Sequence, residues 1–364
     1  MPDERFLPSL LAKMEGLGAS DLHIKAGSPP IFRIKGVPQR VKAENLTPER
    51  AEEVIREILR EREINIFDTT GSVDFAHQIP DVGRFRINVF RQRGLVSFAA
   101  RRVNSRPPTL EELTLPPAMA KLTDLHDGLV LVAVVTGSGK TTTLAALIEM
   151  INQKERCHIL TIEDPIEFVY SDAKAFISQR EVGVDVPSFP VALKYAMRED
   201  PDVILVGEMR DPETVEAAIA ASETGHLVFG TLHSTNAMQT VTRILEFFPP
   251  DRQPSIRAMM SYIYRAAIVQ RLMPSIRPER PRVPALEIMF VDPVIRKHIA
   301  DGEDVKIPKQ IRAMARDGMQ DFNMALFNLV KEGWITEEIA LSNSSQPEQL
   351  HMQFRGMVLN ADAT

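Results

Sequence analysis

The pattern of hydrophobic and polar positions divides the chain into two parts. In residues 1–105, short β-like segments such as 31–34 and 84–89 flank an amphipathic helical stretch over residues 48–62. This mixture predicts a small α+β domain. Residues 106–116 hold three prolines and interrupt the pattern, as a linker between domains does.

Beyond the linker the pattern changes to continuous apolar segments. Four of them, at residues 129–135, 158–162, 202–207 and 226–232, alternate with helix-like stretches such as 215–222. This alternation is typical of a mostly parallel sheet with helices on both faces, and it predicts an α/β core over residues 117–274. Residues 274–283 are rich in proline and arginine, and we expect the region 275–364 to be mainly helical, with a loose tail over the last dozen residues.

Composition narrows the class of protein. The chain has 364 residues, of which 44% are hydrophobic and 25% charged, as in an ordinary globular protein. A net charge of -6 argues against a surface built to bind nucleic acid. The single cysteine, Cys157, excludes an internal disulfide. The acidic N-terminus lacks a signal-peptide pattern, and the apolar run at 129–135 is too short to span a bilayer, so we expect a cytoplasmic protein.

The segment that follows the first apolar run is a phosphate-binding loop. It places glycines, a lysine and a hydroxyl at the start of a helix, where backbone N–H groups and the helix dipole favour a polyphosphate. The candidate nucleotide-binding residues are Thr136, Gly137, Ser138, Gly139, Lys140, Thr141 and Thr142. Lys140 would reach the terminal phosphates of ATP, and the Thr141 hydroxyl would ligate Mg²⁺.

One position departs from the full pattern of such loops. The pattern G-x-x-x-x-G-K-[ST] requires glycine at position 134, and this chain has Val134. A β-branched residue resists positive φ and prefers extended geometry. If the loop requires positive φ there, we expect strain of about 1–3 kcal/mol on nucleotide binding.

The other apolar segments also end in residues that can take part in chemistry. Glu163 follows the second segment and Glu208 the third, and a carboxylate at such a strand end can polarise water or hold Mg²⁺. His226 begins the fourth segment and His233 follows it, and a histidine beside a phosphate could sense it by hydrogen bonding.

Each of these residues also has a plain structural interpretation. A strand-end carboxylate often caps a helix, and a histidine in an apolar strand is often a core residue. The arginines of residues 84–102, among them Arg86 and Arg101, could form a solvated face. Two carboxylates that end apolar segments downstream of a phosphate-binding loop favour the catalytic interpretation over the structural one.

Taken together, the motifs resemble the type IV pilus retraction ATPases, the PilT/PilU group of the secretion ATPase superfamily. The resemblance covers almost the whole chain. It rests on ASDLHIKAGSPP and DVGRFRINVFRQRG in the first part, and on TIEDPIE, REDPDVILVGEMRD, TGHLVFGTLHSTNA and AIVQRLMP in the second. Family members usually read TGPTGSGK where this chain reads AVVTGSGK.

The resemblance implies a PAS-like N-terminal domain, a RecA-like ATPase core and a homohexameric ring. It implies Glu163 and Glu208 as acidic catalytic residues, His226 as the sensor, and Arg86 and Arg101 as arginines that reach the phosphates. Glu208 would share Mg²⁺ with Thr141. The implied partners are the pilus platform protein of the inner membrane, to which the ring would be peripheral, and a paralogous retraction ATPase.

Pilus assembly ATPases usually carry a four-cysteine zinc element and a longer N-terminal region, so retraction is favoured over extension.

Three functions stay open at this point. Because of Val134, the chain is either a working ATPase with reduced activity or a ring subunit that binds nucleotide without hydrolysis and assists an active paralogue. A DNA-translocating ring is disfavoured by the acidic balance.

Overall fold

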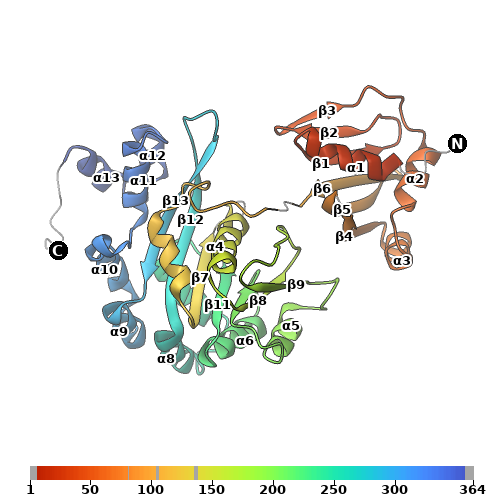
Figure 1. Cartoon of the computed structure of the whole chain (residues 1–364). Coiled ribbons are helices and arrows are strands. Elements are labelled where there is room, and N and C mark those ends of the chain that lie inside the picture. Colours follow the sequence, from red (N-terminus) through yellow and green to blue (C-terminus); the bar gives the residue numbers. More distant parts are fainter. Residues whose placement is uncertain (1–5, 81, 104–105, 135–137, 357–364) are drawn as a thin grey trace. The chain divides into compact units, whose positions relative to one another are not determined.

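The computed structural model describes residues 6–80, 82–103, 106–134 and 138–356. It divides the chain into two compact units, each drawn in Figure 1. The first comprises Met1–Arg106 with Glu167–Val169, and the second comprises Pro107–Ile166 with Tyr170–Thr364.

The first unit is built on an antiparallel six-stranded sheet with the order β3-β2-β1-β6-β5-β4. Its helices α1, α2 and α3 contribute apolar side chains to the same core as one face of this sheet. The strands are β1 (Ala19–Lys25), β2 (Ile31–Ile34), β3 (Val37–Arg40), β4 (Ser72–Ile79), β5 (Gly83–Gln92) and β6 (Leu95–Arg102). The helices are α1 (Phe6–Gly16), α2 (Pro48–Arg56) and α3 (Glu61–Thr70).

The predicted strands at 31–34 and 84–89 are confirmed as β2 and part of β5. The single helix predicted over 48–62 is wrong, because two helices occupy this region with a break at residues 57–60. Thr47 caps α2, whereas α3 starts afresh with the Glu63 carboxylate accepting the N–H of Arg60. Ile58 and Leu59 in the break are also buried in the core. The apolar pattern therefore continues through the break, and nothing in it marks the end of α2.

The second unit is built on a seven-stranded sheet with the order β13-β12-β7-β11-β10-β8-β9. All neighbouring strands are parallel except β12 and β13. The strands are β7 (Gly128–Val134), β8 (His158–Glu163), β9 (Phe176–Glu181), β10 (Val203–Val206), β11 (Leu227–Leu232), β12 (Tyr264–Pro274) and β13 (Arg282–Phe290). The four apolar segments predicted as parallel strands are therefore confirmed as β7, β8, β10 and β11.

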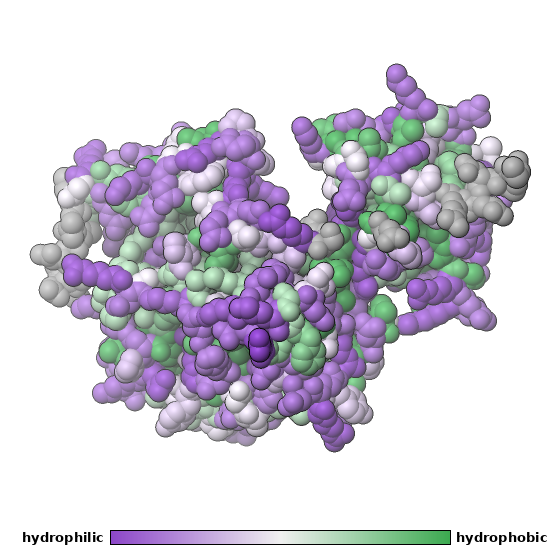
Figure 2. All heavy atoms as spheres, in the orientation of Figure 1, coloured by the Kyte–Doolittle hydropathy of each residue, from purple (hydrophilic) through white to green (hydrophobic). Residues whose placement is uncertain are grey.

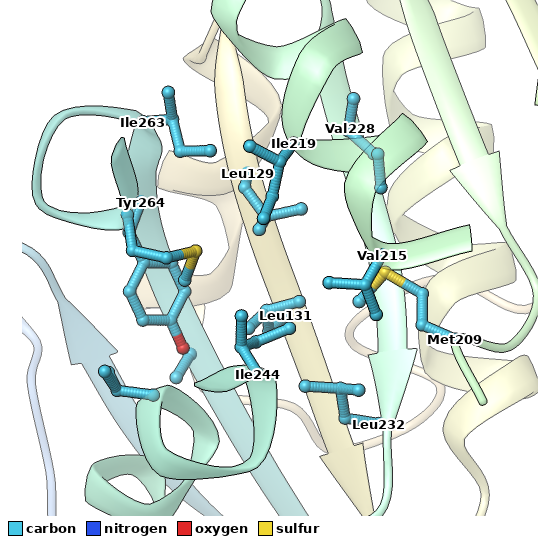
Figure 3. Packing of buried hydrophobic residues seen from close by; sticks show 14 of the residues in the cluster. Leu129, Leu131, Met209, Val215, Ile219, Val228, Leu232, Ile244, Ile263 and Tyr264 are labelled. Carbon is cyan, nitrogen blue, oxygen red and sulfur yellow. The ribbon is translucent and has the colours of Figure 1, made fainter. Parts of the chain in front are cut away.

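Helices of this unit cover the sheet and complete its core. Figure 3 shows Leu129 and Leu131 of β7 in one apolar cluster with Ile219 of α6 and Ile244 of α7. Within it the Tyr264 hydroxyl and the Thr240 hydroxyl hydrogen-bond at 2.6 Å, so the polar tip of this buried tyrosine is paired. The helices concerned are η1 (Pro117–Asp124), α4 (Lys140–Lys154), α5 (Phe189–Ala196), α6 (Pro212–Glu223), α7 (Ala237–Glu246) and α8 (Gln253–Ile263).

The C-terminal region is helical, but later in the chain than predicted. Residues 282–290, expected within that region, form the strand β13, which pairs antiparallel with β12. Seven of its nine residues are buried in an unbroken run, so no alternation of period two marks it as a strand. The helices that follow are α9 (Pro293–Asp301), η2 (Asp304–Lys306), α10 (Ile307–Ala313), η3 (Ala315–Asp317), α11 (Phe322–Lys331), α12 (Glu337–Asn343) and α13 (Pro347–Phe354).

Together the two units confirm the predicted mixed α/β fold class, an α+β unit followed by an α/β core. The face shown in Figure 2 is largely hydrophilic, with hydrophobic residues scattered across it. Among the described residues, no helix combines the length and the apolar character that crossing a membrane requires. The predicted tail falls largely on residues 357–364, which lie outside the described part.

Candidate functional site

The described end of the phosphate loop leads directly into helix α4. Gly139 precedes the helix with a φ of 85°, a conformation that favours glycine, and Lys140 is the first helical residue. Thr141 and Thr142 lie in the first turn and are partly exposed. Thr136 and Gly137, predicted to contact nucleotide, lie outside the described residues.

The chemistry of this loop end fits a polyphosphate. The Ser138 hydroxyl oxygen is buried and finds no hydrogen-bond partner among the residues that the structure describes. Such a donor is costly to leave unpaired, and a phosphate oxygen would satisfy it. The neighbouring N-terminus of α4 adds free N–H groups and a favourable dipole.

The backbone at Val134 removes the reason to expect strain there. Val134 is the last residue of β7 and pairs in parallel register with Gln270 of β12. An extended strand is the conformation that a β-branched residue prefers. In this structure, position 134 therefore does not require the positive φ that only glycine adopts easily.

Glu208 follows strand β10 closely and faces a lysine, an arginine and a histidine. Its Oε2 is 3.8 Å from the Lys140 Nζ, and its Oε1 is 3.0 Å from the His233 Nε2. The Arg210 guanidinium also pairs with this carboxylate. The structure thus brings two predicted site residues, Lys140 and Glu208, to the carboxyl edge of the sheet, where ligands bind in folds of this kind.

The electrostatic environment keeps Glu208 ionised. Partial burial opposes the charge, but the bonds from Arg210 and His233 and the charge of Lys140 outweigh it and lower the pKa of the Glu208 carboxyl. A carboxylate with a lowered pKa stays negative at every pH near neutrality. It can therefore orient water or a hydrated cation throughout that range.

Glu163 is the last residue of β8 and is only 5% exposed. Its Oε1 accepts hydrogen bonds from the Thr161 hydroxyl at 2.7 Å and from the Gln179 amide at 3.2 Å. These two donors fix the direction of the carboxylate. Since β8 is the parallel neighbour of β10, Glu163 ends its strand at the same edge of the sheet as Glu208.

The structure separates the two histidines that bracket β11. His226 precedes the strand, and its Nδ1 lies 2.9 Å from the Ala221 carbonyl oxygen at the end of α6. That is the amino edge of the sheet, opposite the phosphate loop. His233 follows the strand and contacts Glu208, so the histidine that reaches the candidate site is His233 and not the predicted His226.

Arg86 and Arg101 are direct cross-strand neighbours on β5 and β6 of the first unit. Both belong to the polar face of that sheet, opposite its core. They line a shallow pocket with Asp21, His23, Asp74 and Asn88. The Arg101 Nε donates to the Asp21 Oδ1 at 2.8 Å, which leaves most of the guanidinium exposed.

Sequence reasoning missed two residues that organise the loop after β11. The buried Glu287 of β13 accepts the N–H of Ala237, the first residue of α7, at 2.9 Å. The Arg271 Nη2 of β12 donates to the Thr235 carbonyl oxygen at 3.0 Å. Together they hold the segment that carries His233. The signal available was a lone glutamate in the apolar run ALEIMF.

We predict that Glu287→Gln stabilises the protein at alkaline pH. Burial raises the pKa of Glu287 to about 7, against the pull of the Ala237 N–H. The folded state then binds the proton more tightly than the unfolded chain, so stability falls as pH rises from about 4.5 to 7. Gln keeps an acceptor for Ala237 and abolishes the charge.

The expected gain at pH 8 is about 3 kcal/mol in the free energy of unfolding, and it should vanish near pH 4.5. Denaturant unfolding of both proteins at the two pH values measures it. An equal gain at both pH values would show that the charge of Glu287 has no part in the effect.

Comparison with known proteins identifies the family. The family model described as "Type II/IV secretion system protein" matches residues 108–326. The type IV pilus retraction ATPase PilT of Pseudomonas aeruginosa is 41% identical over 342 residues, covering 94% of this chain and 99% of that protein. The type IV pilus ATPase PilU of the same organism is 38% identical, covering 95% of this chain and 90% of that protein.

The fold agrees with these relatives. A crystal structure of the pilus retraction motor PilT with bound ADP matches with a TM-score of 0.87 and 43% identity, covering 95% of this chain and 98% of the other. The match includes both the N-terminal unit and the ATPase core. The chain therefore belongs to the type II/IV secretion ATPase family and, within it, to the PilT/PilU-like type IV pilus retraction ATPases.

Proposed function

We propose that this chain is an Mg²⁺-dependent ATPase that forms a homohexameric ring and powers retraction of a type IV pilus. The observation that carries the hydrolytic part is the ionised Glu208 carboxylate, 3.8 Å from the Lys140 ammonium at the mouth of the phosphate loop. An intact lysine and an intact strand-end carboxylate are what phosphoryl transfer from ATP requires of the protein. The names of the relatives supply the link to pilus retraction.

In this proposal the loop and the start of α4 bind the phosphates and the metal ion. Lys140 and the N–H groups at the start of α4 bind the phosphates, and the Ser138 hydroxyl gains a partner, which it lacks among the described residues. The hard oxygen donors of Thr141 and Glu208 suit Mg²⁺, which keeps several waters and needs few protein ligands. The ion, when bound, neutralises charge on the phosphates.

The acidic residues of the sheet edge act on water. Glu208 and Glu163 orient or deprotonate the attacking molecule, and Glu163 is held in place by Thr161 and Gln179. His233 replaces His226 as the proposed sensor because it contacts Glu208. A change in the charge near Glu208 would therefore alter its hydrogen bond with His233 and, through that residue, the segment that leads into α7.

Membership of the family supports a proposal for the partners and the location. We propose that the ring acts at the cytoplasmic side of the inner membrane, on the pilus platform protein, and that a paralogous retraction ATPase can share this task. The similarity to both PilT and PilU supports membership of such a pair. We propose no role for nucleic acid, in keeping with the net charge of -6.

The competing proposal is a ring subunit that binds nucleotide without hydrolysis. Its only support was Val134, and the extended backbone there weakens that support. We predict that Val134→Gly changes kcat/KM for ATP by less than about threefold, because the backbone at the native valine is extended and does not require glycine. Glycine within a strand costs about 0.5–1 kcal/mol, so we also expect a slightly lower melting temperature.

Hydrolysis by the purified ring at saturating Mg-ATP measures this prediction. Ala133→Gly is the matched control, since it places glycine at the preceding position of the same strand. A native chain that turns over no ATP, together with a Val134→Gly protein that does, would establish the non-hydrolysing subunit instead.

A further inference from the structure

Gln270 of β12 connects the phosphate loop to helix α4 through a single side chain. Its Nε2 donates to the Ser138 carbonyl oxygen at 2.7 Å, and its Oε1 accepts from the Thr143 hydroxyl on α4, also at 2.7 Å. The residue is only 2% exposed. A buried amide with both ends paired is costly to disturb, so it holds Ser138 and helix α4 in one arrangement.

The bond to Ser138 fixes the direction of one peptide group. In a planar trans peptide the carbonyl and the N–H point in opposite directions. The one cis bond in the described chain is Asp164–Pro165, so the peptide between Ser138 and Gly139 is trans. Because its carbonyl points to Gln270, its N–H, which belongs to Gly139, points away from that side chain.

The packing around Gly139 shows how closely Gln270 approaches. A Cβ added at Gly139 would lie 3.1 Å from the Gln270 Nε2, closer than carbon and nitrogen normally pack. Gly139 also has a φ of 85°. Glycine at this position therefore permits the positive φ and also leaves room for the Gln270 amide.

Gln270 also lies beside the strand that feeds the loop, in register with Val134. The segment entering the loop reads Val134-Val135, without the Gly-Pro of the family pattern. At the other end of the loop, the hydrogen bond to the Ser138 carbonyl oxygen also comes from Gln270. Gln270 therefore connects the strands β7 and β12 to Ser138, which lies 132 positions earlier in the chain.

We propose that Gln270 is a positioning residue that holds the peptide between Ser138 and Gly139 so that the Gly139 N–H points at a nucleotide phosphate. The inference rests on the proposed function, since it requires nucleotide at this loop. Gln270 itself touches the protein and not the phosphate. Its loss should weaken nucleotide binding without removing any group that contacts the nucleotide.

Two variants test the two hydrogen bonds of the Gln270 side chain separately. Gln270→Met keeps the length and removes both polar groups. Thr143→Val removes only the bond to α4 and leaves the bond to Ser138. Equilibrium binding of a fluorescent ADP analogue with Mg²⁺ is the measurement, and thermal unfolding without nucleotide reports stability separately. We expect Gln270→Met to raise Kd at least tenfold and Thr143→Val to raise it less than threefold.

The outcomes are distinct. A Gln270→Met protein that binds within threefold of the native chain would overturn the positioning role while leaving the proposed function intact. Equal weakening by Thr143→Val would overturn it too, because Gln270 would then act through α4. If the methionine variant does not fold, Gln270→Glu tests the same point, since a carboxylate cannot donate to Ser138. A native chain that binds no nucleotide would overturn the proposed function together with this inference.

Discussion

Replacing Glu208 by glutamine is expected to lower kcat for ATP hydrolysis by at least about 100-fold while nucleotide binding is kept. General-base and electrostatic groups of this kind contribute factors of about 10² to 10⁴. Glutamine preserves the size of the side chain and can still accept a hydrogen bond from His233. What it loses is the negative charge that faces Lys140 and Arg210.

The same substitution should leave ADP binding unchanged or tighter. Lys140 loses the carboxylate 3.8 Å away, so its positive charge becomes fully available to the phosphates. A split of this kind, with kcat reduced and Kd retained, marks a group that acts in the transition state and not in ground-state binding.

Steady-state hydrolysis and fluorescent ADP binding, measured on the same preparation, test both parts. Glu216→Gln is the control, because Glu216 lies on the exposed surface of α6 and pairs with Arg252, and neither residue has a role in the proposed site. We expect it to change kcat less than twofold. Hydrolysis by Glu208→Gln within threefold of the native rate would remove Glu208 from the catalytic residues.

The strands that carry this site could be predicted because their sequences are continuous apolar runs that end in polar residues. From the sequence alone, that rule placed Glu163 and Glu208 at the carboxyl edge of the sheet, where the strands β8 and β10 end. The same rule also distinguishes the two histidines by the edge of the sheet at which each one lies. Since β11 is parallel to β10, only His233, which follows the strand, can reach Glu208.

The remaining features depend on contacts that a local pattern does not encode. Gln270 and Ser138 meet across 132 positions, and Ala237 meets Glu287 across 50. The strands β12 and β13 are buried along most of their length, so no alternation of apolar and polar residues marked them as strands. The break between α2 and α3 is buried as well, and its apolar residues continue the helical pattern.

The second large effect is expected from Arg101→Gln, which should lower kcat by about 100-fold or more with little change in stability. An arginine that neutralises transition-state charge in phosphoryl transfer contributes about 10³ to 10⁵ in rate. The Arg101 side chain is 70% exposed, although Asp21 holds its Nε, so the rest of the guanidinium is available to an anion. The buried Asp21 carboxylate keeps the Ser20 hydroxyl at 2.7 Å and Arg33 at 3.7 Å as partners, so we expect only a small loss of folding energy.

Arg91→Gln is the matched control for this variant. Arg91 lies on β5 like Arg86, but its guanidinium stacks on the Phe67 ring at 4.9 Å, on the core side of the sheet. We expect this variant to keep its kcat and to lose a little stability through that contact. A fall in kcat equal to that of Arg101→Gln would show that any loss of positive charge from this sheet is enough.

Mixing two inactive variants tests which subunit the arginine serves. If Arg101 acts on nucleotide bound by a neighbouring copy, rings assembled from Arg101→Gln and Glu208→Gln chains contain some sites with both native residues. Such rings should recover a measurable part of the native ATPase rate, whereas each variant alone stays inactive. If Arg101 acts within its own chain, every site in the mixed ring lacks one residue and no activity returns. Recovery would therefore require both the assembly and the catalytic role of Arg101, and its absence despite mixed rings would exclude action between subunits.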